Sequence, residues 1–304
     1  MRNSVLFCSL LLGSLCFARP LQAADIAWIS FHTNADMASA AAMGATPPHT
    51  VAPDKAYTDL LMASGHTVTR FLTMDTPDTA ALNSFDLVII SRSVNSGHYE
   101  TDAETARWAG ITAPVMILGG YTLRANRLGF TTGNTIPDST GPISLTVNDP
   151  GHPIFAGIPL DATNTMVNPY ADIVTFGGDV QRGVSVNTNP VAGGGTVLAT
   201  VGTAGDPTFG GMIIGQWGPG AMMGNSPPDT LAGHRLVFLT GTREAAGDSS
   251  ETAGLFDLSP NGQTMFVNAA NFMIAIPEPS TFALCGIALA GLGLLRWKTR
   301  RSAA

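Results

Sequence analysis

The sequence predicts an α/β fold in which a parallel β-sheet is flanked by helices. Short apolar runs in the first half of the chain lack the polar alternation of a half-exposed strand, which indicates strands covered on both faces. Segments with helical patterns lie between these runs, and strands that alternate with helices form parallel sheets. The second half is rich in Gly, Thr and Pro and predicts additional β-rich loops.

Four short segments in the first half predict strands, over residues 26–30, 67–71, 87–91 and 115–118. A helix between the first two begins at Pro53, because proline suits the first helical turn, and ends at Gly65. Thr101 and Glu104 have the spacing of a capping box, which predicts a further helix that carries Trp108.

Five runs in the second half predict strands joined by long loops, over residues 143–147, 172–176, 196–201, 211–215 and 235–240. A last helix begins with Ser259 as its N-cap and Pro260 in its first turn. Its predicted buried stripe comprises Met265, Ala269, Phe272 and Met273.

Several of these segments together resemble a known superfamily. They are GHTVTRF, SFDLVIIS, APVMILGG, GHPIFAGI, HRLVFLTG and NGQTMFVNAANFMI, in this order. The order resembles the class I glutamine-amidotransferase-like superfamily in its broad, ThuA-like sense, over most of residues 25–274. The resemblance implies one domain over residues 24–276 with a flavodoxin-like core. Glutaminases of this superfamily use a cysteine with a His–Glu pair, whereas residues 24–276 contain no cysteine.

The N-terminus has the pattern of a Sec-type signal peptide over residues 1–23. Arg2 precedes an apolar stretch at 5–17, and a cleavage zone with the small residues Ala23 and Ala24 follows at 21–24, so we expect signal peptidase to cut after Ala23 or Ala24. The Sec translocon would export the chain, and the cut would follow. A retained N-terminal anchor is the alternative.

The C-terminus, residues 277–304, resembles the PEP-CTERM sorting signal of Gram-negative bacteria. Its elements are Pro277, Glu278 and Pro279, an apolar run at 282–295, and a basic end with Arg296, Lys298, Arg300 and Arg301. A helix of fourteen residues covers about 21 Å, a marginal span that would tether the protein to the inner membrane. The resemblance implies cutting by an exosortase and delivery to the cell surface of an organism that produces exopolysaccharide. A plain membrane anchor is the alternative.

Composition excludes several classes of function. Residues 24–276 carry nine basic and 21 acidic side chains, a net charge near −12, which argues against nucleic acid as a partner. The lack of cysteine there excludes disulfides, iron–sulfur clusters and a thiol nucleophile. We predict no cofactor and no metal, because the six histidines show no metal-binding spacing. A metal held by His32, His98 and an acid is the alternative.

The candidate site follows from the fold class, because ligands bind open α/β sheets at the carboxyl ends of the strands. The residues expected there are His32, Arg92, Ser93, His98, Tyr121 and Arg124. Arg92, Arg124 and Arg127 could clamp a carboxylate or a sugar acid, or else pair with nearby acids. Tyr121 and Trp217 could stack on sugar rings.

A serine nucleophile is a second possibility for the same loops. Ser93 or Ser96 with His98 and with Glu100 or Asp102 supplies the residue types, but the G-x-S-x-G motif is missing. The alternative is a polar loop whose side chains bind backbone groups.

We interpret Asp36, Asp54 and Asp59 as surface carboxylates, since a calcium loop pattern is missing. The sequence as a whole predicts a non-catalytic envelope or exopolysaccharide-matrix protein that binds carbohydrate or another surface component. A hydrolase or metal-assisted enzyme acting on carbohydrate or amide substrates is the alternative.

Overall fold

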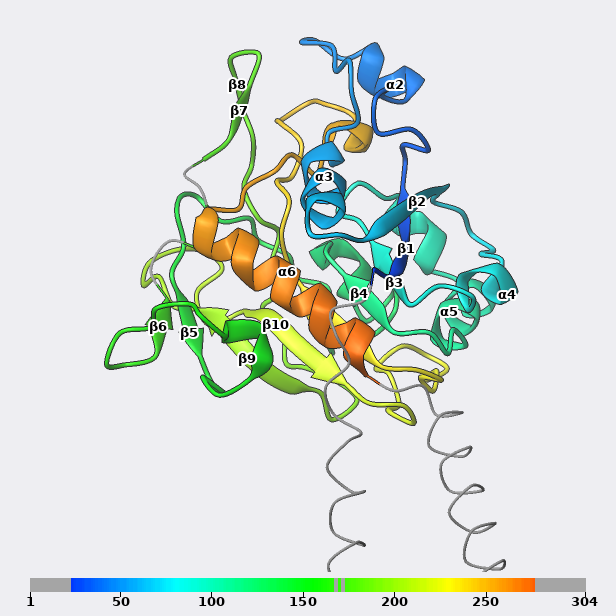
Figure 1. Ribbon diagram of the computed structural model, residues 1–304, viewed down its shortest axis with the longest axis vertical. Coiled ribbons are helices and arrows are strands. Elements are labelled where there is room, and N and C mark those ends of the chain that lie inside the picture. The colour runs from blue at the N-terminus through cyan, green and yellow to red at the C-terminus, as the bar shows by residue number, and fades with distance from the viewer. Residues whose placement is uncertain (1–22, 167–168, 171–172, 277–304) are drawn as a thin grey trace, which may run out of the picture.

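The computed structural model describes residues 23–166, 169–170 and 173–276 of the 304-residue chain (Figure 1). Of the predicted processing residues, the two alternative cleavage positions fall inside these ranges, just before the first strand: Ala23 is exposed and Ala24 is buried. The remaining residues of the predicted leader, and Pro277, Glu278, Pro279 and the basic end, lie outside them. None of the helices in the described ranges is both long and apolar enough to cross a membrane.

The centre of the protein is a nine-stranded sheet with the order β2-β1-β3-β4-β11-β10-β9-β5-β6. The first five strands of this order are mutually parallel. They are β1 (Asp25–Ser30), β2 (Thr67–Leu72), β3 (Leu87–Ile90), β4 (Val115–Ile117) and β11 (Arg235–Phe238). In chain order this is the 2-1-3-4-5 arrangement of flavodoxin-like folds. The predicted fold class is therefore confirmed, and all five strands overlap predicted ones.

The C-terminal half extends the same sheet with antiparallel strands. These are β5 (Leu145–Val147), β6 (Thr165–Met166), β9 (Thr196–Val201) and β10 (Met212–Trp217). A separate hairpin of β7 (Thr175–Phe176) and β8 (Asp179–Val180) projects from the body (Figure 1). The strand expected over 172–176 is thus only two residues long within the described part, and it pairs with β8 rather than with the main sheet.

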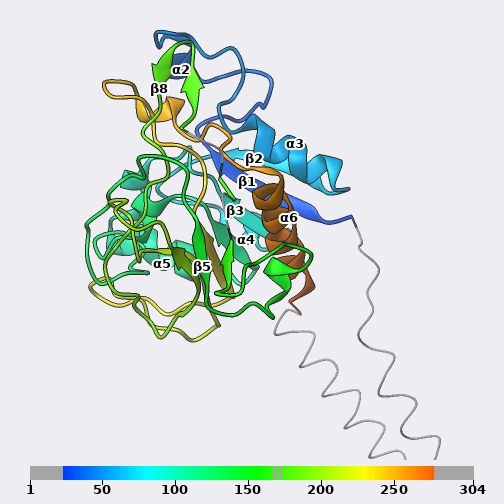
Figure 2. The same ribbon diagram turned by 90° about the vertical axis from the view of Figure 1, so that its left-hand side faces the viewer.

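Helices cover both faces of the sheet. Figure 2 shows α3 (Lys55–Ala63) and α6 (Pro260–Ala275) on one face and α5 (Asp102–Ala109) on the other. The short helix α4 (Thr79–Leu82) lies beside α5 (Figure 1). The remaining turns are α2 (Ala40–Met43), η1 (Ser96–Tyr99), η2 (Gly120–Leu123), η3 (Pro153–Phe155) and η4 (Ser250–Thr252).

The helix termini are set by local chemistry that the sequence predicts. The Ser259 side chain accepts a hydrogen bond from the N–H of Gly262 and so caps α6, as predicted. The predicted capping box of α5 is also confirmed, because the Glu104 carboxylate accepts the N–H of Thr101 at 3.0 Å. Of the predicted α6 stripe only Phe272 differs: it is partly buried.

Arg235 joins the sheet to α5 from inside the core. It is 2% exposed, and its guanidinium donates hydrogen bonds to the carbonyls of Trp108, Ala109 and Ile111 at 2.7–3.1 Å. The first two carbonyls lie in the last turn of α5 and the third follows just beyond it, so the cation also offsets the negative end of the helix dipole. The contact fixes the start of β11 against the end of α5.

Candidate functional site

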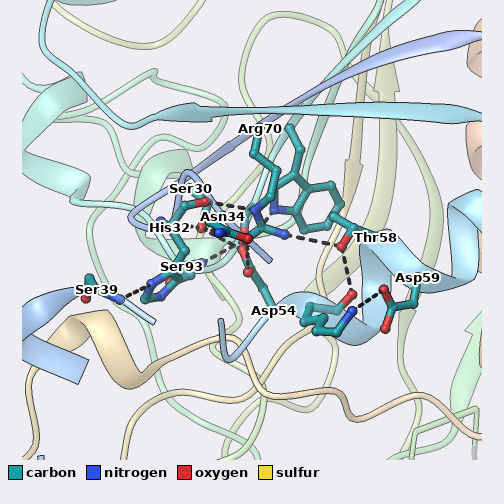
Figure 3. Close-up of polar contacts among 12 residues, drawn as sticks. Ser30, His32, Asn34, Ser39, Asp54, Thr58, Asp59, Arg70 and Ser93 are labelled. Atoms are coloured by element: carbon teal, nitrogen blue, oxygen red, sulfur yellow. Dashed lines mark hydrogen bonds and ion pairs between the residues drawn. The ribbon is translucent and has the colours of Figure 1, made fainter. Parts of the chain in front are cut away.

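A buried ion pair organises the carboxyl ends of the first three strands (Figure 3). Arg70 of β2 pairs with Asp54, the residue that precedes α3, and both side chains are at most 6% exposed. Trp28 Nε1, Ser30 Oγ and Ser91 Oγ donate hydrogen bonds to the Asp54 carboxylate at 2.8, 2.7 and 2.7 Å. Residues two apart in a strand face the same side of the sheet, which is why Trp28 and Ser30 reach the same acid.

The interpretation of Asp54 as a surface carboxylate is therefore wrong. Its side chain is enclosed, because Arg70, Trp28 and two serines converge on it from three neighbouring strands. Burial alone would raise its pKa, but Arg70 and these hydrogen bonds outweigh burial and hold the pKa below its usual value. Asp54 is thus an ionised structural residue.

The same network fixes the turns that follow β1 and β3. Arg70 Nε donates to the carbonyl of His32 at 2.8 Å, and the N–H of Ser93 donates to Ser91 Oγ at 3.0 Å. The two turns are joined directly, because the N–H of Phe31 donates to the carbonyl of Ser93 at 2.8 Å. The position of the residue between the serines, Arg92, is set by these contacts.

His32 is locked in one neutral tautomer. Its Nδ1 accepts the backbone N–H of Ser39 at 2.9 Å, so Nε2 must carry the proton that it shares with the carbonyl of Glu251 at 3.0 Å. Burial lowers the pKa of His32, which agrees with the neutral form. Both ring nitrogens are occupied, and this arrangement suits a structural role rather than proton transfer.

His98 is joined to neither candidate serine by a hydrogen bond. Its Nδ1 lies 3.1 Å from Thr73 Oγ1, and its Nε2 lies 3.2 Å from a carboxylate oxygen of Asp75. Ser93 Oγ is buried and has no hydrogen-bond partner among the described residues. The serine–histidine arrangement considered from the sequence is therefore not assembled. Within the described ranges, no group of three or more His, Cys, Asp or Glu side chains could hold a metal ion.

The structure instead gathers arginines around one tyrosine. The guanidinium carbons of Arg92, Arg124 and Arg243 lie 5.3, 5.2 and 5.2 Å from the centre of the Tyr121 ring. Arg92 follows β3, Tyr121 and Arg124 belong to η2 and its C-cap after β4, and Arg243 follows β11. We call these four residues the Tyr121 cluster. It lies where the carboxyl ends of adjacent parallel strands meet, the usual ligand position in such sheets.

Two carboxylates partly neutralise the Tyr121 cluster. Glu244 lies 3.5 Å from Arg92 and 3.3 Å from Arg243, and it also pairs with Arg182. Asp138 binds Arg243 at 2.8 Å. Three guanidinium groups, of Arg92, Arg182 and Arg243, thus share two acids, an excess of positive charge in a domain whose net charge is near −12.

Arg92 is the least satisfied member of the Tyr121 cluster. It is 6% exposed, its Nε has no hydrogen-bond partner among the described residues, and Glu244, the one acid paired with it, lies 3.5 Å away. Burial lowers its pKa, although Glu244 opposes that shift. Buried polar groups normally have hydrogen-bond partners, because an unpaired one costs free energy. The Arg92 Nε is thus a buried donor without a partner in the described part of the chain.

Glycine at position 241 makes room for this arginine. Gly241 has a φ of +83°, and a Cβ built there would lie 2.9 Å from the Cβ of Arg92. Only glycine adopts this conformation and approach without strain. The glycine in the loop after β11 therefore leaves the space that Arg92, after β3, occupies.

The other predicted arginines differ in their contacts. Arg124 donates to the carbonyl of Tyr121 at 2.9 Å and to Ser96 Oγ at 3.2 Å, and has no carboxylate within 4.0 Å among the described residues. Arg127 pairs with Glu100 at 2.9 Å. Pairing with a nearby acid, rather than with a ligand, is the alternative given for these arginines in the sequence analysis. Arg124 is thus the cluster arginine best placed to meet a ligand acid.

Trp217 does not stack on a ligand, contrary to the possibility raised above. It is 3% exposed in β10, donates its Nε1–H to the carbonyl of Ala192 at 2.9 Å, and packs edge-on against Phe130. Sequence reasoning also missed Arg243. Its position three residues past the strand predicted over 235–240 was the available signal, the same one that identified Arg92.

Comparisons with known proteins add little to this geometry. No family model matches the chain, and no curated protein matches it. Among solved structures, the chain is similar to a GMP synthase component from Thermoplasma acidophilum, at 10% identity and a TM-score of 0.36, over 84% of this chain and 94% of the other. At this score the likeness carries no argument, and the fold assignment follows from the strand order.

Proposed function

We propose that this chain is an exported, surface-sorted envelope or exopolysaccharide-matrix protein whose domain binds an anionic carbohydrate without transforming it. The observation that carries the binding proposal is the Tyr121 cluster, in which three guanidinium groups surround one half-buried tyrosine and Arg92 lacks adequate partners. Export rests on the leader-like N-terminus and the PEP-CTERM-like C-terminus of the sequence.

An acid sugar suits the chemistry of the Tyr121 cluster. A guanidinium offers a planar pair of N–H donors that matches a carboxylate or sulfate, and such charge-assisted bonds are stronger than neutral ones. Arg124 is half-buried and unopposed by a carboxylate among the described residues, so it is the first contact. Arg92 then completes its hydrogen bonding on the same anion.

A binding role without catalysis agrees with the contacts of the histidines. His32 has no free nitrogen to serve as a base, and His98 is joined to Thr73 and Asp75 rather than to a serine. General acid–base catalysis needs a titratable group within hydrogen-bond reach of the reacting atoms.

The proposal is tested by retention on an immobilised acidic polysaccharide such as alginate, compared with neutral dextran. We expect alginate to retain the protein and dextran not to retain it. Arg92→Gln combined with Arg124→Gln should abolish retention on alginate while the far-UV circular dichroism stays unchanged. Arg107→Gln, at an exposed position of α5, removes one positive charge elsewhere and serves as the control. Unchanged retention of the double variant would overturn the assignment.

A further inference from the structure

A polar cavity of about 350 Å³ lies next to the Tyr121 cluster. It opens between the start of α5, the turn after η2 and the loop at 224–226. Its polar lining includes Glu100, Asp102, Asn126, Arg127, Asn134 and Asn225. Carboxylate and amide side chains outnumber the single arginine in this lining, unlike in the arginine-rich cluster.

One turn of the chain connects the two sites. The N–H of Arg127 donates to the carbonyl of Arg124 at 2.9 Å, which closes a four-residue turn. The Cα atoms at the ends of such a turn are less than about 7 Å apart. Arg124 reaches the ring of Tyr121, whereas Arg127 pairs with Glu100 in the cavity wall. A ligand bound at Arg124 therefore has its neighbouring unit at the cavity.

Three side chains of the cavity have capacity left for a ligand. Among the described residues, the side chains of Asn126 and Asp102 make no hydrogen bond, and Asn134 uses only its Oδ1, which accepts the N–H of Asn126 at 3.2 Å. Asn225, by contrast, is held by Asp229. Amide and carboxylate groups supply both donors and acceptors, as the hydroxyl groups of a sugar require.

The charge of the cavity disfavours a second acidic unit. Glu100 offsets Arg127, and Asp102 then leaves the cavity with a net negative charge. A second carboxylate placed here would be repelled, because like charges at short range are unfavourable. The acid group and the hydroxyl-rich unit are thus recognised in different places.

We infer that the ligand is an acidic oligosaccharide in which an acid sugar adjoins a neutral one, with the acid at the Tyr121 cluster and the neutral sugar in the polar cavity. This inference rests on the proposed function and specifies its ligand. The spacing of the two sites, one turn of the chain, suits neighbouring units of a polysaccharide.

The test compares three probes on the full-length protein by calorimetric titration: glucuronate, a disaccharide of glucuronate linked to glucose, and a disaccharide of two glucuronates. We expect the mixed disaccharide to bind about tenfold more tightly than glucuronate, the effect of one or two additional hydrogen bonds. The diuronate should bind more weakly than the mixed disaccharide.

The double variant Asn126→Ala with Asn134→Ala should remove the tenfold gain and leave the affinity for glucuronate within about threefold of that of the unchanged protein. Asn261→Ala, at the start of α6 on the opposite face of the sheet, is the matched control. This inference is overturned if the mixed disaccharide binds the unchanged protein no more tightly than glucuronate does, or if its tenfold advantage persists in the double variant. Either result would leave the proposed function standing. Failure of glucuronate and both disaccharides to bind would overturn the proposed function together with it.

Discussion

Replacing Asp54 by alanine should destabilise the domain strongly. The substitution leaves the Arg70 guanidinium buried without its acid and removes the acceptor shared by Trp28, Ser30 and Ser91. Breaking a buried ion pair by removing one partner costs about 3–5 kcal/mol, and each buried donor left without an acceptor costs about 1–3 kcal/mol more unless water reaches it. We expect a loss of at least about 3 kcal/mol, a large part of the roughly 5–15 kcal/mol typical of a domain.

Urea unfolding measures this loss, and a double-mutant cycle isolates the pair. Arg70→Met in the Asp54→Ala background removes the uncompensated charge, so the double variant should be more stable than the sum of the single losses predicts. Additive losses, or a loss below about 1 kcal/mol for Asp54→Ala, would refute the description of the pair as buried and coupled.

The pH dependence gives an independent check on the same residue. The folded-state pKa of Asp54 lies below the value of about 3.9 expected in the unfolded chain. Its contribution to stability is therefore present above about pH 4 and is lost as the pH falls through the folded-state pKa. Asp54→Ala should reduce the acid-induced loss of stability, and an unchanged acid limb would contradict this account.

Three further predictions follow from other parts of the chain. Asp257 accepts hydrogen bonds from Tyr57 and Thr240 through one oxygen, and burial raises its pKa despite these bonds, so stability should fall as the pH rises above about 4. Asp257→Asn should reduce that fall in urea titrations, and an unchanged pH profile would count against a buried, protonated acid. Gly241→Ala should cost about 1–3 kcal/mol and weaken binding of acid sugars through Arg92; unaltered stability and affinity would contradict the close approach. The intact mass of protein from hosts with and without an exosortase should show loss of residues 277–304 only where the enzyme is present, whereas retention of this segment in both hosts would favour a plain anchor.

The sheet and its main helices were predictable because their signals are local. A strand covered on both faces must be apolar throughout, and the caps at Ser259 and at Thr101 with Glu104 use side chains within three or four residues of the groups they bind. For the antiparallel part of the sheet, the sequence predicted strands joined by long loops but not which strands pair. Pairing partners such as β5 and β9 are far apart in the sequence.

The site was harder to predict because it depends on contacts between distant segments. Asp54 looks like a surface residue in its own segment and is buried only because β1, β2 and β3 bring Ser30, Arg70 and Ser91 around it. The position of Arg92 and Arg124 at strand ends was readable, whereas their convergence on Tyr121 with Arg243 required the order of the strands in the sheet.

The most direct test of the binding account is a calorimetric titration of the full-length protein with glucuronate and with glucose. The account predicts that glucuronate binds, that glucose does not, and that Arg124→Gln weakens glucuronate at least about tenfold while Arg107→Gln has no effect. Equal behaviour of the two sugars, or full affinity in Arg124→Gln, would contradict anion recognition at the Tyr121 cluster.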